Sequence, residues 1–167
     1  GQVGIFAIQV ALVGLFRHYG IEPGVVLPHS MGEATSAWVT GGLSLEDAVR
    51  VICQRSRLMG EGEEMLPEEM ERFMALVEYS AADIETVLGD YEGPTHTVLG
   101  GPGKVIDKIV AETEAKGLMA RKLVTRGASH TSQMDPLLGE LQAELMGIEP
   151  HALKYPMYST VNKDEFY

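Results

Sequence analysis

Apolar residues fill nearly every position of the first long stretch of the chain, residues 3–18. A helix that is apolar on all faces is typical of a helix buried on all sides, and we expect one here. A β-branched run at 24–27 (GVVL) follows and predicts a short buried parallel strand. A turn centred on Ser30 then leads into a helix expected over 32–40. Strand, turn and helix in this order indicate an α/β core.

Two more helices are expected outside the middle of the chain. The first runs from Ser44 to about Met59, because Ser44 is a good N-cap residue and Asp47 three positions later forms a weak capping box with it. An acidic, glycine-bearing stretch at 60–72 follows and is expected to be solvated. Near the other end, apolar residues at helical spacing predict a continuous helix over 132–147.

The middle of the chain alternates between strand and helix patterns. Strands are expected at 73–79, 95–101 and 119–125, with helices at 80–88 and 102–116. This alternation indicates a small α+β subdomain of ferredoxin-like type. That plan has four strands, whereas the sequence supplies three.

The predicted fold class is therefore α/β: a serine-hydrolase-like α/β core with an inserted ferredoxin-like α+β subdomain. Residues 1–66 and 125–167 are assigned to the core that carries the Ser30 turn, and residues 67–124 to the subdomain. Gly1 already lies inside a helix pattern, so we interpret the chain as a fragment of a larger protein.

Composition and charge exclude several classes of function. The 167 residues are 45% hydrophobic and 22% charged, as in an ordinary globular domain. A net charge of −11 argues against nucleic acid or an anionic membrane surface as a partner. No apolar run reaches the roughly 20 residues of a membrane span, and no signal peptide is recognisable. The single cysteine, Cys53, and the absence of metal-ligand spacing favour a metal-free domain of the reducing cytoplasm.

The stretch VVLPHSMGE, residues 25–33, carries the clearest chemical signal. A strand that feeds a sharp turn with serine at its apex, a glycine two residues on and a helix beyond is the arrangement of a nucleophile elbow. Such a turn lifts the Ser30 hydroxyl clear of the backbone at a helix N-terminus, where the Met31 N–H can serve as an oxyanion donor. The alternative is that Ser30 only caps a helix.

Residues 28–59 as a whole resemble the acyltransferase domains of type I fatty-acid and polyketide synthases, and the related malonyl-CoA:acyl-carrier-protein transacylases. Their signature is G-H-S-x-G-E, then glycine and a helix that bears an arginine. It is matched here by His29, Ser30, Met31, Gly32, Glu33, Gly41, Gly42 and Arg55. A second signature, a four-residue box ending in histidine, is matched by GASH at 127–130. Residues 127–141 look closest to the acyltransferase domain of the mycolic-acid-condensing polyketide synthases of mycobacteria and corynebacteria.

This resemblance implies a Ser–His dyad without a triad acid. Ser30 would form an acyl ester, and His130 would act first as general base and then as general acid. Arg55 would bind the free carboxylate of a malonyl-type acyl group, a bidentate task that suits a guanidinium. Arg57 is the competing candidate, two residues further along the same helix.

The resemblance also assigns supporting and pocket residues. Gln2 matches a family glutamine in the network behind the active site, and His29 supports the turn. Gly127, Ser129 and Met31 are expected to line the acyl pocket. Because related enzymes carry a bulky residue or tyrosine where Gly127 stands, we expect room for a 2-carboxyacyl group with a long alkyl branch.

The implied reaction moves a (2-carboxy)acyl group from CoA to the phosphopantetheine of an acyl carrier protein, with no cofactor in this domain. The expected partners are acyl-CoA, that carrier protein and neighbouring domains of a multifunctional synthase. One alternative is a serine hydrolase or thioesterase on the same elbow. Another is a catalytically decayed synthase domain, for which the only support is Pro28 in place of the first glycine of the signature.

Overall fold

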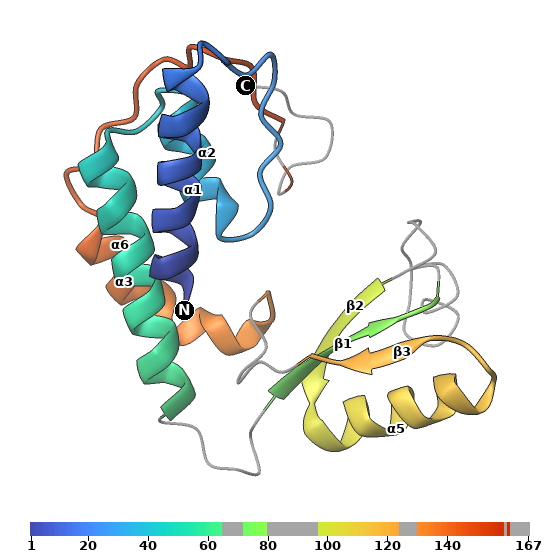
Figure 1. Cartoon of the computed structure of the whole chain (residues 1–167). Coiled ribbons are helices and arrows are strands. Elements are labelled where there is room, and N and C mark those ends of the chain that lie inside the picture. Colours follow the sequence, from blue (N-terminus) through green and yellow to red (C-terminus); the bar gives the residue numbers. More distant parts are fainter. Residues whose placement is uncertain (65–71, 80–96, 124–129, 159, 161–167) are drawn as a thin grey trace. The chain divides into compact units, whose positions relative to one another are not determined.

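The computed structural model describes residues 1–64, 72–79, 97–123, 130–158 and 160 (Figure 1). The chain divides into two compact units: Gly1–Gly60 with Gly139–Tyr167, and Glu61–Leu138. The second unit therefore extends on both sides beyond the range 67–124 that the sequence assigned to the subdomain. The part beyond residue 124 contains His130.

Three helices build the first unit: α1 (Gln2–His18), α2 (Gly32–Val39) and α3 (Leu45–Glu64). The start of α3 has the N-cap bond of the expected capping box, while the Asp47 side chain bonds to the Ser44 hydroxyl and not to its N–H. The Asp47 N–H donates to Ser44 Oγ (3.0 Å), and the Ser44 hydroxyl donates to the Asp47 carboxylate (2.7 Å). The helix runs on past the expected end at Met59.

The core of this unit lies where the three helices meet. Its buried residues are Phe6 of α1, Ala34 of α2, and Ala48 and Ile52 of α3. Two small alanines in this set let the helix backbones approach closely around the larger Phe6 and Ile52 side chains. The core thus fixes α2, the helix that follows the Ser30 turn, against both of its neighbours.

The expectation that α1 is buried on all sides is wrong. Phe6 is its only buried residue, although the helix itself is confirmed. Its exposed large apolar side chains are Val3, Ile5, Ile8, Leu12, Leu15 and Phe16. An apolar pattern predicts the helix, but burial requires neighbours, and among the described residues α2 and α3 cover the Phe6 face.

The buried strand expected at 24–27 is also wrong. Val26 forms a single parallel bridge with Met157. The Val26 N–H donates to the Pro156 carbonyl (2.9 Å), and the Tyr158 N–H donates to the Val26 carbonyl (3.1 Å). Val25 and Leu27 are exposed, because this extended segment has a hydrogen-bonded neighbour on one side only among the described residues.

Two glycines end α2 for different reasons. Gly41 has a φ of +85°, a left-handed conformation that favours glycine after a helix. A Cβ on Gly42 would lie 2.7 Å from Leu153 Cδ2, so a side chain here would require the Leu153 side chain to move. The Gly42 carbonyl also accepts a hydrogen bond from the His151 N–H (2.9 Å). These contacts hold the segment around 151–154 against the end of α2.

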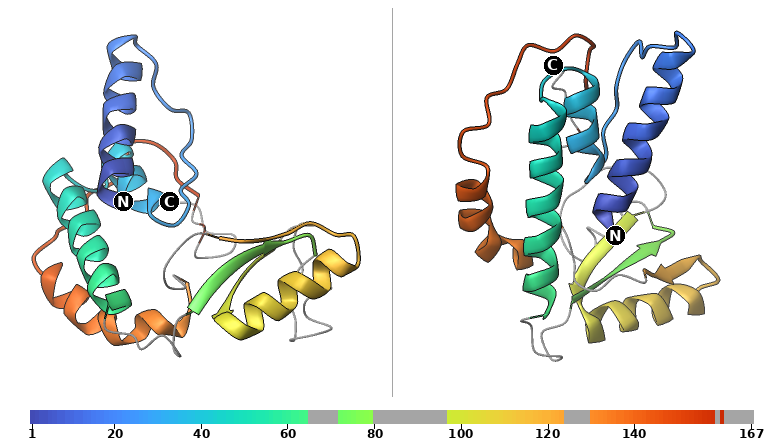
Figure 2. Two further views of the ribbon diagram at one scale, coloured as in Figure 1. Left: turned by 60° about the horizontal axis from the view of Figure 1, so that its bottom comes forward. Right: turned by 60° about the vertical axis from the view of Figure 1, so that its left-hand side comes forward.

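The second unit contains an antiparallel sheet of three described strands in the order β2-β1-β3. They are β1 (Arg72–Val77), β2 (Thr97–Pro102) and β3 (Ala120–Lys122). Helix α5 (Gly103–Ala115) connects β2 to β3 and lies along one face of the sheet, as Figure 2 shows. This split β-α-β arrangement is that of the ferredoxin-like subdomain expected from the sequence.

The core of the second unit consists of alternate residues of β1 and one residue of α5. Ala75 and Val77 point to the same face of β1, and Ile106 packs on them. The three predicted strands and the helix at 102–116 are therefore confirmed. The helix expected at 80–88 lies outside the described residues.

The helix expected over 132–147 is interrupted. The chain forms a 3-10 helix, η2 (Ser132–Leu137), and then α6 (Leu138–Glu144). Pro136 lies inside η2 and has no N–H to donate to a carbonyl four residues earlier, so a continuous α-helix cannot pass through it. None of the described helices is long and apolar enough to cross a membrane.

Candidate active site

Ser30 stands at the apex of a strained turn. Its φ is 51°, in the left-handed region that a residue with a side chain seldom occupies and that costs about 1–3 kcal/mol. Two hydrogen bonds close the turn: the Gly32 N–H donates to the His29 carbonyl (2.9 Å), and the Glu33 N–H donates to the Ser30 carbonyl (3.1 Å). Helix α2 starts two residues after Ser30. This is the backbone geometry of a nucleophile elbow.

Pro28 does not prevent this geometry. Its side chain is buried, and the turn and helix form directly after it. Met31 has helical angles (φ −59°, ψ −22°) at the N-cap position of α2, so its N–H is among the donors that a helix start leaves without an intrahelical acceptor. The His29 side chain is exposed, and the residue contributes its carbonyl to the turn.

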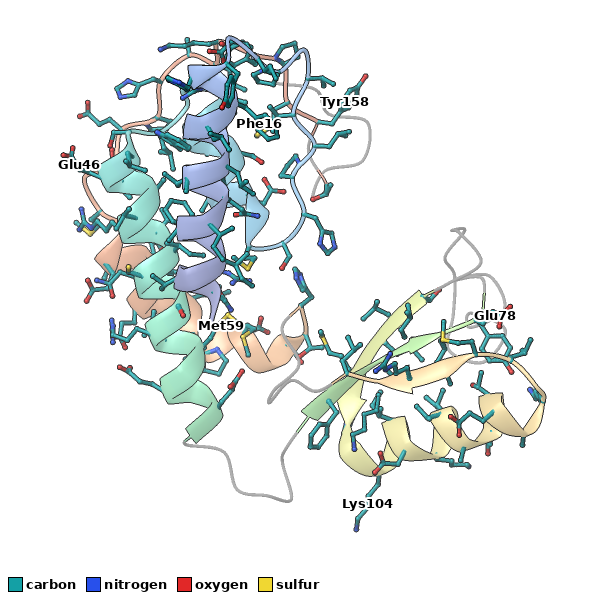
Figure 3. The ribbon with its side chains drawn as sticks, in the orientation of Figure 1. Phe16, Glu46, Met59, Glu78, Lys104 and Tyr158 are labelled. Atoms are coloured by element: carbon teal, nitrogen blue, oxygen red, sulfur yellow. The ribbon has the colours of Figure 1, made fainter. Side chains whose placement is uncertain are left out.

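Arg55 is held inside the first unit by Gln2, the residue that begins α1. Its Nη1 donates to Gln2 Oε1, and the Gln2 side-chain amide lies 3.4 Å from Met59 Sδ. Figure 3 shows Met59 close to the beginning of α1. Burial lowers the pKa of the Arg55 guanidinium. Among the described residues no carboxylate pairs with this half-buried cation, so it retains the capacity to bind an anion.

Arg57, the competing arginine, is engaged elsewhere. It is exposed and donates to Gln54 of its own helix. It also forms ion pairs with Glu140 (3.0 Å) and Glu144 (3.5 Å) of α6. Its charge is therefore already matched by two carboxylates, whereas that of Arg55 is not.

His130, like Ser30, has a positive φ, 68°. It is exposed and lies just before η2, whose start is marked by a bond from the Met134 N–H to the Thr131 carbonyl (3.0 Å). It belongs to the second unit, whereas Ser30 belongs to the first. Pairing between Ser30 and His130 therefore stays a prediction, and the pocket residues Gly127 and Ser129 lie outside the described residues.

Some contacts near the turn were not anticipated. The Thr160 hydroxyl donates to the Glu33 carboxylate (3.0 Å), and the Thr35 hydroxyl donates to Gln9 Oε1 (2.5 Å). Glu33 belongs to the signature, but Thr160 stands far along the chain in a segment without a motif. No sequence signal links these two residues.

The described residues contain no group of three His, Cys, Asp or Glu that could hold a metal ion.

A pocket of about 460 Å³ lies in the first unit near the end of α2, and Ser30 and Arg55 do not line it. Arg17 is one of its lining residues, with its guanidinium over the Trp38 ring and bonded to the Val39 carbonyl (3.0 Å). Glu22 pairs with Arg17 (3.4 Å) and accepts a hydrogen bond from the Tyr155 hydroxyl (2.9 Å). Because these groups satisfy one another, we interpret them as a structural network that joins α1, α2 and the segment at Tyr155.

The strained Ser30 turn beside a parallel-bridged segment, together with the ferredoxin-like subdomain, defines an α/β protein of the nucleophile-elbow class. A family model described as "Acyl transferase domain" matches residues 1–166. The chain belongs to this family.

Relatives agree with this assignment. The chain is 39% identical over 168 residues to a mycocerosic acid synthase-like polyketide synthase of Mycolicibacterium smegmatis, covering 98% of the chain and 8% of the relative. It is 40% identical over 162 residues to a phthioceranic/hydroxyphthioceranic acid synthase of Mycobacterium tuberculosis, covering 95% and 8%. The chain thus spans about 8% of the length of these relatives. They are mycobacterial polyketide synthases, as the resemblance implied, although their names refer to other acids than mycolic acids.

Solved structures confirm the fold class. The acyltransferase domain of the polyketide synthase PpsC of Mycobacterium tuberculosis superposes with a TM-score of 0.85 at 33% identity, covering 98% of this chain and 50% of that one. The acyltransferase domain of phenolphthiocerol/phtiocerol synthase A from Mycobacterium bovis (BCG) gives 0.83 at 32%, covering 98% and 63%.

Proposed function

We propose that this chain forms part of an acyltransferase that loads a 2-carboxyacyl group from CoA onto an acyl carrier protein. The observation that carries the proposal is the left-handed Ser30 at the start of α2, in a chain of the acyl transferase domain family. A serine that only capped a helix would need no such strained backbone.

In the first half-reaction Ser30 Oγ attacks the thioester carbonyl carbon while His130 accepts the hydroxyl proton. The carbon–sulfur bond then breaks, and His130 returns the proton to the departing CoA thiol. In the second half-reaction the phosphopantetheine thiol of the carrier protein gives its proton to His130 and attacks the ester carbonyl. The new thioester forms, and Ser30 regains its hydroxyl proton from His130.

The oxyanion that develops in each half-reaction needs a fixed hydrogen-bond donor. The Met31 N–H occupies the first position of a helix start, where the helix dipole also favours negative charge. Because the elbow fixes this N–H next to Ser30, the donor is positioned before the substrate arrives. This supports Met31 as one oxyanion donor.

Arg55 supports a carboxylate-bearing acyl group. It is half-buried, is held by Gln2 and has no carboxylate partner among the described residues, whereas Arg57 has two. A general esterase or thioesterase has no use for such a cation. We assign the long alkyl branch of the substrate to the space that Gly127 leaves, with Ser129 and Met31 as further pocket residues.

Intact-mass measurement tests this proposal. The chain and its parent synthase are exposed briefly to malonyl-CoA, methylmalonyl-CoA and a long-chain 2-carboxyacyl-CoA, beside Ser30→Ala and the matched control Ser56→Ala. We expect a mass gain equal to the acyl group in the wild type and in Ser56→Ala, and none in Ser30→Ala. The acyl-CoA that labels fastest identifies the substrate class.

Two other results would change the assignment. If the acyl adduct is hydrolysed to free acid, and the rate is the same with and without an acyl carrier protein, the domain is a hydrolase. A parent synthase whose Ser30 takes up no acyl group from any of the three thioesters would indicate a decayed domain.

A further inference from the structure

One short segment near the C-terminal end bonds to the Ser30 turn from both sides. Before the turn, Val26 exchanges backbone hydrogen bonds with Pro156 (2.9 Å) and Tyr158 (3.1 Å). After the turn, Glu33 accepts a hydrogen bond from the Thr160 hydroxyl (3.0 Å). Figure 3 shows Tyr158 beside the segment that leads into α2.

Glu33 is bonded to the turn through its backbone as well as through its side chain. Its N–H donates to the Ser30 carbonyl (3.1 Å), while its carboxylate accepts from Thr160. A carboxylate in the first turn of a helix also interacts favourably with the helix N-terminus. One residue therefore connects the strained serine, the start of α2 and the distant segment.

Strain of this kind persists only where the surrounding structure holds it. The backbone bridge at Val26 fixes the chain before Ser30, and the Glu33–Thr160 bond fixes it afterwards. With both sides attached to one segment, the Ser30 Oγ has a defined position relative to the Met31 N–H. Loss of either attachment would let the turn relax toward an ordinary φ.

We propose that Glu33 and Thr160 are positioning residues that hold Ser30 in its reactive conformation through their hydroxyl–carboxylate bond. This inference rests on the proposed function, because it assumes that Ser30 is acylated. Neither residue needs to touch the acyl group. They are expected to affect the rate at which Ser30 reacts and not the binding of acyl-CoA.

The test uses Thr160→Val, which removes the hydroxyl and keeps the shape of the side chain. The acylation rate of Ser30 is followed by intact mass over a range of malonyl-CoA concentrations. We expect the maximal rate to fall about 3- to 10-fold, the range of one net hydrogen bond, with the half-saturating concentration unchanged. Thr160→Ser keeps the hydroxyl and should restore the rate.

Matched variants separate this role from general stability. Tyr155→Phe removes a hydroxyl–carboxylate bond of the same unit, to Glu22, that involves no residue of the turn, so its acylation rate should equal that of the wild type. Glu33→Ala combined with Thr160→Val should be no slower than Glu33→Ala alone, because both changes remove one bond. Additive losses, or a wild-type rate in Thr160→Val, would overturn the proposal.

Hydrogen exchange gives a readout that does not depend on acylation. The Glu33 amide, which donates to the Ser30 carbonyl, should exchange faster in Thr160→Val than in Tyr155→Phe by a factor similar to the loss in rate. Unchanged exchange at Glu33 would overturn the positioning role even if acylation occurs. Faster exchange in a protein that forms no adduct would still support the role of the Glu33–Thr160 bond in holding the turn. It would refute only the proposed function.

Discussion

The two units of this chain differ in how their apolar residues are covered. In the second unit, Ala75 and Val77 of β1 are buried under Ile106 of α5, so sheet and helix cover one another. In the first unit, α1 buries Phe6 but exposes most of its other large apolar side chains. The residue pattern correctly predicted β1, α5 and α1 as elements. It predicted burial of α1 on all sides, and there it was wrong, because among the described residues only the Phe6 face of this helix is covered.

The proposed chemistry is divided between the same two units. The first unit carries Ser30, Met31 and the cation Arg55, and it fixes them with local hydrogen bonds. The second unit carries His130, in a left-handed conformation just before η2. The comparison predicts that recognition of the acyl carboxylate resides in the first unit, at Arg55, while His130 sets the reaction rate for every substrate.

The largest effect is expected from His130→Ala. Removal of a general base lowers rates by about 10²- to 10⁴-fold, and it should do so by the same factor for malonyl-CoA and for an acyl-CoA without a carboxylate. Acylation rates from intact-mass time courses measure both factors. The control is His18→Ala, which removes an exposed histidine of α1. A loss that depends on the acyl group would contradict the division of roles.

The next largest effect is on the free energy of unfolding, when the core of either unit loses a buried side chain. Ile52→Ala and Ile106→Ala each delete fully buried methyl groups and should cost about 2–5 kcal/mol in free energy of unfolding. Hydrogen exchange should show that Ile52→Ala loosens amides of α1, α2 and α3, and that Ile106→Ala loosens those of β1 and α5. If either variant loosened both sets equally, the two units would unfold as one.

Local features explain most of what the sequence predicted correctly. The Ser44 capping box, the Ser30 turn and the strand pattern of β1 depend on residues close in the chain. The expected strand at 24–27 failed because the pairing of Val26 depends on Met157, far along the chain. The break at Pro136 had a plain signal, since proline cannot continue an α-helix, and the prediction of one long helix overlooked it.

In the candidate site, too, contacts between residues far apart in the chain were harder to predict than local geometry. The Ser30 elbow follows from its own sequence, whereas the family resemblance alone pointed to Gln2 and Arg55, which the structure brings into contact. The bond between Glu33 and Thr160 could not be inferred, because nothing in the residues around Thr160 marks it as a partner of the turn.

Arg55→Ala should reduce the preference for acyl groups that carry a free carboxylate. Removing the cation that pairs with the acyl carboxylate is expected to lower kcat/KM for malonyl-CoA by about 30- to 150-fold, equivalent to about 2–3 kcal/mol. An acyl-CoA without a carboxylate should be little affected, and Arg55→Lys should recover only part of the loss.

Arg57→Ala is the matched control for this change. It removes an exposed guanidinium whose ion pairs with Glu140 and Glu144 contribute little to stability, and it should leave selectivity unchanged. Equal effects of the two arginine variants on malonyl-CoA would contradict the assignment of Arg55 as the carboxylate-binding residue.

The smallest effect is expected on the exposed face of α1. Ile8 is 61% exposed, so Ile8→Gln should change the free energy of unfolding of this chain by no more than about 0.5 kcal/mol. Phe6→Ala, on the buried face of the same helix, should cost about 3–5 kcal/mol. Urea denaturation of both variants measures the difference. A loss above 1 kcal/mol for Ile8→Gln would mean that this face is packed in solution, and the contrast between the two units would then disappear.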